Sequence, residues 1–146
     1  MVKTLFLNPE LAFAHNIKLK AKYDRIELSE VRCEEVETDG DMDVLIVSFG
    51  TMARVCRTSM DSLRSKGLKV GLIRPISLYP FPLEEIRRAA SRAKLVVSVE
   101  LSMGQLVEDV DRAVRGQAPV RWYGKAGGLV PIPDEVTEAI LGMVEG

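Results

Sequence analysis

The sequence predicts an α/β domain in which helices cover both faces of a mostly parallel sheet. Short apolar runs rich in Val, Ile and Leu recur along the chain, amphipathic stretches lie between them, and glycine or proline stands at many of the junctions. Continuous apolar runs are typical of strands buried on both faces, and strands that alternate with helices through short crossovers form parallel sheets. The length of 146 residues suits one such domain.

The first forty residues form an arm with a less regular pattern. Residues 7–21 combine helical and loop character. Residues 26–36 alternate weakly between apolar and polar side chains, which predicts an edge strand. Because Asp39-Gly40-Asp41 is a turn signal, we expect the boundary between the arm (1–40) and the α/β domain (41–146) at this point.

The first strand of the domain is predicted over residues 44–49, a continuous apolar run that ends at Gly50. Lys66 and Gly67 end the helix that follows, because a cation is favourable in the last turn and glycine adopts the left-handed conformation found there. The helix expected over 51–66 places four apolar side chains on one face: Met52, Cys56, Met60 and Leu63.

A second strand is expected over residues 70–74, followed by a proline-rich connection. Pro75 and the segment 79–82 impose an extended path on the chain. Pro82 suits the first position of a helix, whose dipole Glu84 and Glu85 complement. A third strand follows over residues 95–99.

The turn after the third strand predicts a capping box. In the segment 102–105 (Ser-Met-Gly-Gln), we expect the Ser102 hydroxyl to accept from the Gln105 amide, and the Gln105 side chain to accept from the serine amide. Leu101 and Leu106 occupy the positions of a hydrophobic staple.

The C-terminal part predicts one more strand and one more helix. Residues 120–123 form a short strand, and a glycine-rich loop follows over 124–129. A simple turn explains this loop better than a phosphate-binding cradle, because a proline rather than a helix follows the glycines. Pro133 opens the last helix, with Asp134 and Glu135 in its first turn.

Charge and composition argue against several classes of partner and site. With 20 basic and 21 acidic residues, the net charge of −1 gives no electrostatic reason to expect nucleic acid or an anionic membrane surface. No apolar run is long enough to span a bilayer, and the N-terminus lacks a signal-peptide pattern, so we expect a cytoplasmic protein. Cys33 and Cys56 stand too far apart to build a zinc or iron–sulfur site locally, and we expect both to be buried, unpaired thiols.

Six residues are candidates for a strand-end or interface site: Glu100, Ser102, Gly104, Gln105, Tyr79 and Phe81. Glu100 ends a buried strand at the edge where open α/β sheets bind ligands. Two roles are open for it: an acid, base or partner contact, or an acceptor for backbone amides in the turn. Tyr79 and Phe81 lie among prolines, where they either form a subunit contact or pack against the neighbouring helix.

No catalytic, cofactor-binding or metal-binding residue is predicted. His15 is the only histidine, and no nucleophile accompanies it in the arm. Neither of the common glycine-rich nucleotide signatures occurs in the sequence. No reaction can be assembled from the residues of this chain.

Four motifs occur in a fixed order: DVLIVSFGT at residues 43–51, GLKVGLIRPISLYPFP at 67–82, VELSMGQLVEDV at 99–110 and VRWYGKAGGLVP at 120–131. Each motif alone is weakly specific. Together, in this order and with these separations, they resemble the C-terminal portion of the alpha subunit of 2-oxoacid:ferredoxin oxidoreductases. The third and fourth motifs look most like the enzymes that act on branched-chain 2-oxoacids such as 2-ketoisovalerate, with the 2-oxoglutarate and pyruvate enzymes as close rivals.

The resemblance implies a fold similar to the transketolase C-terminal domain. That fold has three α/β/α layers around a five-stranded sheet with one antiparallel strand, which the strand expected over 26–36 would supply. It also implies a structural and assembly role in a complex that decarboxylates a 2-oxoacid on thiamine diphosphate and Mg. Electrons then pass through iron–sulfur clusters to ferredoxin, and the acyl group leaves on coenzyme A.

The partners implied are the thiamine-binding and iron–sulfur subunits, in a homo- or hetero-oligomer, and ferredoxin through the complex. This chain lacks the thiamine-binding Gly-Asp-Gly segment, a cysteine cluster motif and the substrate domain of the alpha subunit. We therefore expect the reactive groups on other polypeptides or on another part of this protein, and no turnover by the isolated chain. Some relatives carry Asn where this chain has Ser102, and substrate selection in the family lies outside this region.

Two other functions are compatible with the sequence. The chain could be the equivalent domain of another thiamine-dependent enzyme, such as a transketolase or a dehydrogenase beta subunit. It could also be a free-standing module that binds a small ligand with the loops after Gly50, Arg74 and Glu100, in which case a ligand would raise its melting temperature.

Overall fold

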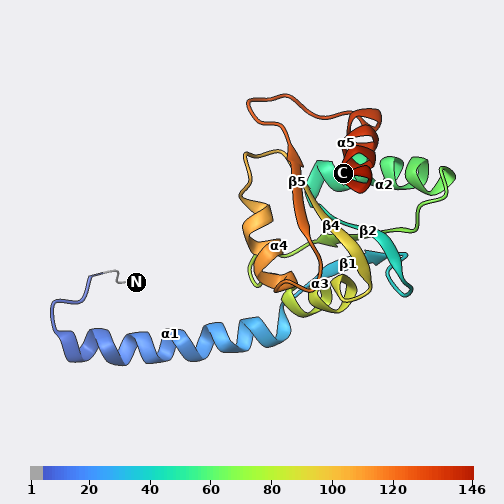
Figure 1. The fold of residues 1–146 in the computed structure, drawn as a ribbon. Coiled ribbons are helices and arrows are strands. Elements are labelled where there is room, and N and C mark those ends of the chain that lie inside the picture. The colour runs from blue at the N-terminus through green and yellow to red at the C-terminus, as the bar shows by residue number, and fades with distance from the viewer. Residues whose placement is uncertain (1–4) are drawn as a thin grey trace.

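A five-stranded mixed sheet forms the centre of the computed structural model, which describes residues 5–146 (Figure 1). Strands β2, β3, β4 and β5 run parallel to one another, and β1 pairs antiparallel with β3 at the edge. This arrangement confirms the predicted fold class. In the spatial order of the sheet, the strands are β1 (Cys33–Val36), β3 (Val70–Pro75), β2 (Met42–Val47), β4 (Ala93–Glu100) and β5 (Val120–Gly124).

Helices cover both faces of the sheet, as predicted. Helices α2 (Gly50–Ser65) and α5 (Pro133–Glu145) lie on one face, and α3 (Leu83–Ala90) and α4 (Leu106–Val114) lie on the other (Figure 1). Side chains of strand β2 contribute to the hydrophobic cores on both faces of the sheet. Val44 and Ile46 join the core under α2 and α5, whereas Leu45 joins the core under α3 and α4, because successive side chains of a strand point to opposite faces.

The N-terminal arm corrects two sequence-based expectations. Residues expected to mix helix and loop form α1 (Pro9–Ser29), a 21-residue helix that extends away from the sheet (Figure 1). The strand expected over 26–36 is confined to Cys33–Val36, since residues 26–29 are the last turn of this helix.

The sequence contains the start signal of α1, which the expectations overlooked. The Asn8 side chain accepts a hydrogen bond from the Leu11 amide at 3.0 Å, and Pro9 stands in the first turn. No glycine or proline interrupts residues 10–39, so nothing in the sequence breaks the helix before it ends at Ser29. No residue of α1 is fully buried. The domain boundary near residue 40 stays a prediction.

The connection from β3 to α3 forms hydrogen bonds with the residue that precedes β1. The Arg32 amide donates to Ser77 Oγ at 2.9 Å, and Ser77 Oγ donates to the Pro80 carbonyl at 2.8 Å. The Tyr79–Pro80 peptide bond is cis. Within residues 5–146, no helix is both long enough and apolar enough to cross a membrane.

Candidate functional site at the carboxyl edge of the sheet

The carboxyl ends of the four parallel strands meet at one edge of the sheet, where ligands bind in open α/β folds. Glu100, the last residue of β4, lies at this edge with only 1% of its surface exposed. Its Oε2 accepts hydrogen bonds from the amides of Gln105 at 2.9 Å and Leu106 at 3.0 Å, and its Oε1 accepts from the amide of Val107 at 3.1 Å. These amides belong to the first turn of α4, whose positive dipole end favours a carboxylate.

Two serines complete the environment of this carboxylate. Ser98 Oγ donates to Glu100 Oε1 at 3.3 Å, and Ser102 Oγ donates to Oε2. Five donors therefore converge on the two oxygens, which have about four lone-pair positions between them. The carboxylate is saturated by protein donors, and it fixes the turn between β4 and α4.

This geometry corrects the predicted capping box. The Gln105 amide donates to Glu100 rather than to the Ser102 hydroxyl, and the Gln105 side chain accepts from the Met103 amide at 3.0 Å rather than from the serine. The longer carboxylate of Glu100 reaches the amides that the serine hydroxyl was expected to cap. Of the two roles open for Glu100, its geometry matches the acceptor of backbone amides.

Ser98 is a hydrogen-bond partner of Glu100 that the sequence interpretation missed. Ser98 and Glu100 are two residues apart on β4, so their side chains point to the same face. A serine two positions before a strand-end carboxylate is a signal that could have identified this pair.

Two glycines allow the chain to adopt this turn. Gly104 has a φ of +95°, which L side chains rarely adopt. Gly124, at the end of β5, lies so close to β4 that a Cβ there would stand 2.5 Å from the Glu100 carbonyl oxygen and 3.0 Å from the Ser102 carbonyl oxygen. The ends of β4 and β5 therefore approach each other at a position that only glycine fits.

The glycine-rich loop after β5 forms a turn, as the sequence predicted. Gly127 and Gly128 have φ angles of +70° and +87°. Lys125 Nζ, the one cation of the loop, lies 2.7 Å from Glu135 Oε1 in the first turn of α5.

Tyr79 and Phe81 have different environments. Phe81 is 7% exposed and belongs to the core under α3 and α4, so it packs against the neighbouring helix. Tyr79 is 57% exposed, and its hydroxyl donates to Glu27 Oε1 of α1 at 3.2 Å. The pKa of Tyr79 is raised, mainly by desolvation and to a smaller extent by this hydrogen bond to Glu27. The aromatic pair therefore splits into one core residue and one exposed residue.

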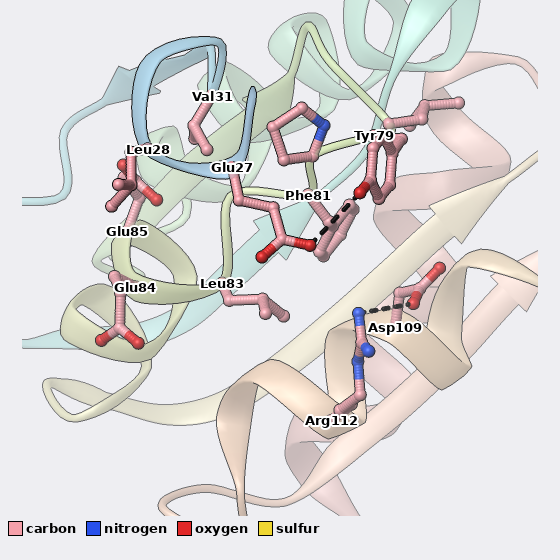
Figure 2. A pocket seen from close by; sticks show the side chains of 12 residues that line it. Glu27, Leu28, Val31, Tyr79, Phe81, Leu83, Glu84, Glu85, Asp109 and Arg112 are labelled. Atoms are coloured by element: carbon pink, nitrogen blue, oxygen red, sulfur yellow. Dashed lines mark hydrogen bonds and ion pairs between the residues drawn. The ribbon is translucent and has the colours of Figure 1, made fainter. Parts of the chain in front are cut away.

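A groove of about 750 Å³ lies between the end of α1, the β3–α3 loop and α4. Figure 2 shows two interactions among its lining residues, the Tyr79–Glu27 hydrogen bond and the ion pair between Arg112 and Asp109 at 3.3 Å. The sequence did not predict this groove, because its walls come from segments far apart in the chain.

Exposed apolar side chains gather on the loops that follow the four parallel strands. Exposed apolar side chains that follow several neighbouring strands are a candidate surface for contact with another protein or a ligand. We call these side chains the apolar edge; within residues 5–146 they are Phe49, Ile76, Leu78, Tyr79, Leu101, Met103, Leu129, Val130 and Ile132.

The described part of the chain offers no fit for a metal or an iron–sulfur cluster. No group of three or more His, Cys, Asp or Glu side chains lies within reach of one ion in residues 5–146. His15 stacks on Phe6, with the ring centroids 4.7 Å apart. Cys33 is partly buried and Cys56 fully buried, and both are free thiols.

We predict that neither thiol reacts with an alkylating reagent in the folded protein at pH 8. Burial raises the pKa of the Cys56 thiol to about 12, and burial with the neighbouring Glu85 raises that of Cys33 to about 11, so the reactive thiolates are absent. Mass spectrometry should find both cysteines unmodified until urea is added. Rapid labelling of Cys56 in the native protein would contradict its placement in the core.

The same shifts predict how the thiols affect stability at high pH. Below the ordinary pKa of 9.0, both states keep their thiol protons. As the pH rises from 9 to about 12, the unfolded chain releases these protons before the folded chain does, so the thiols lower the free energy of unfolding. Urea titrations across this range should show the decline, and Cys56→Ala should make it shallower.

Comparison with known proteins places this geometry among oxidoreductase subunits. The family described as pyruvate:ferredoxin oxidoreductase core domain II matches residues 42–136. Ketoisovalerate oxidoreductase subunit VorB of Methanothermobacter thermautotrophicus is 39% identical over 135 residues, which are 92% of this chain and 38% of that subunit. The 2-oxoglutarate synthase subunit KorA of Methanothermobacter marburgensis is 34% identical over 139 residues, 93% of this chain and 36% of that subunit.

Solved structures show the same fold at lower sequence identity. A 2-oxoglutarate:ferredoxin oxidoreductase from Magnetococcus marinus matches 95% of this chain with a TM-score of 0.76 and 22% identity, over 24% of its own chain. A split-gene transketolase matches 78% of this chain with a TM-score of 0.66 and 22% identity, over 41% of its own chain. This chain spans 38% or less of the length of the two relatives named above.

Proposed function

This chain belongs to the pyruvate:ferredoxin oxidoreductase core domain II family, and from that membership we propose that it is the structural and assembly domain of a 2-oxoacid:ferredoxin oxidoreductase alpha subunit. The complex would decarboxylate a 2-oxoacid with thiamine diphosphate, Mg, iron–sulfur clusters and coenzyme A, and pass the electrons to ferredoxin. In this proposal the cofactors are held outside residues 5–146, and the partners are the thiamine-binding and iron–sulfur subunits.

The apolar edge is the structural observation that supports an assembly role for this chain. Leu101 is 42% exposed and Met103 is 68% exposed, although both lie in a turn that the buried carboxylate of Glu100 holds in one conformation. A rigid turn with exposed apolar side chains favours binding, because little conformational entropy is lost when a partner covers it. We propose that Glu100, Ser102, Gly104 and Gln105 position this turn for a partner subunit, and that they take no part in the chemistry.

We propose 2-ketoisovalerate as the oxoacid class. The ketoisovalerate subunit VorB is 39% identical to this chain, against 34% for the 2-oxoglutarate subunit KorA. A pyruvate synthase subunit PorA of Pyrococcus abyssi is 35% identical over 60% of this chain. The proposal concerns the complex rather than a pocket of this chain, and a cytoplasmic location stays a prediction from the sequence.

Reconstitution tests the assembly role. We expect no reduction of ferredoxin when the purified chain is mixed with 2-ketoisovalerate, coenzyme A and thiamine diphosphate. Thiamine-binding and iron–sulfur subunits of a ketoisovalerate enzyme that lacks its core domain II should gain activity when the chain is added. Oxoacid turnover by the chain alone would contradict the proposal.

The same preparations separate the two alternatives. Stable association with a lipoyl-dependent partner, and none with a ferredoxin-linked one, would identify the equivalent domain of another thiamine enzyme. A small molecule that raises the melting temperature in proportion to the logarithm of its concentration would identify a free-standing binding module.

A further inference from the structure

Helix α1 has little contact with the α/β domain. None of its residues is fully buried, and the helix extends away from the sheet (Figure 1). Leu28, in its last turn, lines the groove but is 87% exposed, so apolar packing fixes the direction of the helix only weakly. A single polar contact with the domain therefore has a large effect on where α1 points.

Tyr79 supplies this contact. Its hydroxyl donates to Glu27 Oε1 at 3.2 Å (Figure 2), and its ring packs edge-on against the ring of Tyr23, with the centroids 6.1 Å apart. Tyr23 and Glu27 are four residues apart on α1, so they lie one turn apart on the same side of the helix. Among residues 5–146, no other hydrogen bond or ion pair joins α1 to residues 33–146.

The short connection between α1 and β1 is fixed at only one of its ends. The Arg32 carbonyl accepts a hydrogen bond from the Ile76 amide at 2.9 Å, which ties this end to the β3–α3 loop. The Glu30 amide donates instead to the Ile26 carbonyl at 2.9 Å, inside the helix. Rotation of the backbone at residues 30–31 therefore swings α1 as one unit.

The length of α1 amplifies any rotation at this pivot. The helix has 21 residues, which at 1.5 Å per residue is about 31 Å. A rotation of about 20° at residues 30–31 thus moves the far end of the helix by roughly 10 Å. The hydrogen bond to Tyr79 lies close to the pivot, where it limits this movement.

We propose that the Tyr79–Glu27 hydrogen bond is a latch that fixes the direction of α1, and that a partner covering the apolar edge closes this latch. Tyr79 belongs to both surfaces, because it contacts α1 and is also one of the exposed side chains of the apolar edge. With the latch open, α1 swings about residues 30–31. The second half of this inference rests on the proposed function, in which a partner subunit covers the apolar edge.

Loss of water explains how a partner closes the latch. Tyr79 is 57% exposed, so in the isolated chain water competes with Glu27 for its hydroxyl. Once a partner covers Tyr79 and the neighbouring Leu78, an open latch leaves this hydroxyl with neither water nor an acceptor, which is unfavourable. The lower dielectric also strengthens the closed hydrogen bond. Because coupling between two equilibria is reciprocal, a closed latch raises the affinity for the partner in turn.

Distances between spin labels on α1 and α2 test the latch in the isolated chain. Labels at Asn16→Cys and Asp61→Cys report the direction of α1, because both positions are exposed and the native thiols keep their protons at pH 7. We expect one main distance, and Tyr79→Phe should raise the population of other distances roughly fivefold, as for one exposed hydrogen bond. Tyr123→Phe, the same change at a tyrosine of β5 packed under α2 and α5, is the matched control.

A double-mutant cycle assigns the effect to this pair of side chains. Glu27→Ala should broaden the distances as much as Tyr79→Phe does, and the double variant should broaden them no further, since both changes remove the same hydrogen bond. Glu27→Gln keeps an acceptor oxygen and should retain the main distance. Circular dichroism should give one melting temperature for all these variants, because Tyr79 is exposed and α1 contains no buried residue.

The thiamine-binding subunit of a ketoisovalerate enzyme lacking its core domain II tests the coupling. When it is bound, the population of other distances should fall roughly fivefold in the chain that keeps Tyr79, by the same estimate for one hydrogen bond. It should stay unchanged in Tyr79→Phe, which has no latch to close.

The two halves of the inference fail separately. Equal distance distributions for Tyr79→Phe and the unsubstituted chain, measured without a partner, would overturn the latch. A bound subunit that leaves the distribution of the unsubstituted chain as it was would overturn the coupling. Absence of binding would contradict the proposed function and the coupling with it, whereas the latch is decided by the isolated chain alone.

Discussion

Glu100→Gln lowers the free energy of unfolding by about 3–5 kcal/mol, the loss expected when one partner of a buried hydrogen-bonded charge network is removed. The carboxylate accepts three amide and two hydroxyl hydrogen bonds, and an amide group would place its own N–H donors against some of these donors. The first turn of α4 would also lose a negative charge. Urea unfolding followed by circular dichroism measures the loss.

Ser102→Ala is the matched control for this prediction. It removes one donor and leaves four on the carboxylate, so it should cost about 1 kcal/mol. Amide hydrogen exchange at Leu106 and Val107 gives an independent readout. The two amides donate to different oxygens of Glu100, and glutamine keeps only one oxygen, so one of the two amides loses its acceptor in the Glu100 variant and neither does in the Ser102 variant. If Glu100→Gln unfolds within 0.5 kcal/mol of the wild type, by a rough limit for neutral surface changes, Glu100 is not the residue that fixes this turn.

Gly124→Ala is expected to cost up to about 3 kcal/mol, the upper part of the range for an overpacked site. The added methyl group would stand 2.5 Å from the Glu100 carbonyl oxygen and 3.0 Å from that of Ser102. Both atoms belong to the backbone, which moves less easily than the end of a flexible side chain. Either β5 separates from β4 or the turn that carries Leu101 and Met103 shifts.

Gly142→Ala separates this effect from the general consequences of losing a glycine. A Cβ at Gly142 meets nothing within 4 Å, and the residue lies inside α5. Alanine there should stabilise the protein by about 0.5–1 kcal/mol, because it favours the helix. Equal melting temperatures for the Gly124 and Gly142 variants would contradict the close approach of β4 and β5.

The sheet and its covering helices were predictable because the central strands β2 and β4 contain continuous apolar runs. Residues 44–48 and 95–99 are buried, so tertiary structure and local pattern favour the same conformation there. Helix α1 was harder to predict. Its apolar residues lie on two opposite sides, so no single amphipathic face appears, and the signals of its start were the cap at Asn8 and Pro9 in the first turn.

The turn at the candidate site shows why local motifs are insufficient. A capping box relates residues three apart, and Ser102 and Gln105 satisfy it in the sequence. In the structure, the last residue of the preceding strand supplies the acceptor, at distances of five to seven residues along the chain. The groove and the apolar edge could not be predicted from local motifs either, because both are assembled from segments far apart in sequence.

The affinity of this chain for the thiamine-binding subunit of a ketoisovalerate enzyme lacking its core domain II tests the central claim most directly. Isothermal titration should give a stable complex for the wild type and for Val144→Asp, an exposed apolar position on α5 outside the apolar edge. Leu101→Asp with Met103→Asp should weaken that complex at least a hundredfold, by a rough estimate for central apolar contacts. Equal affinity of the wild type and the double variant, or no binding by any of them, would contradict the account.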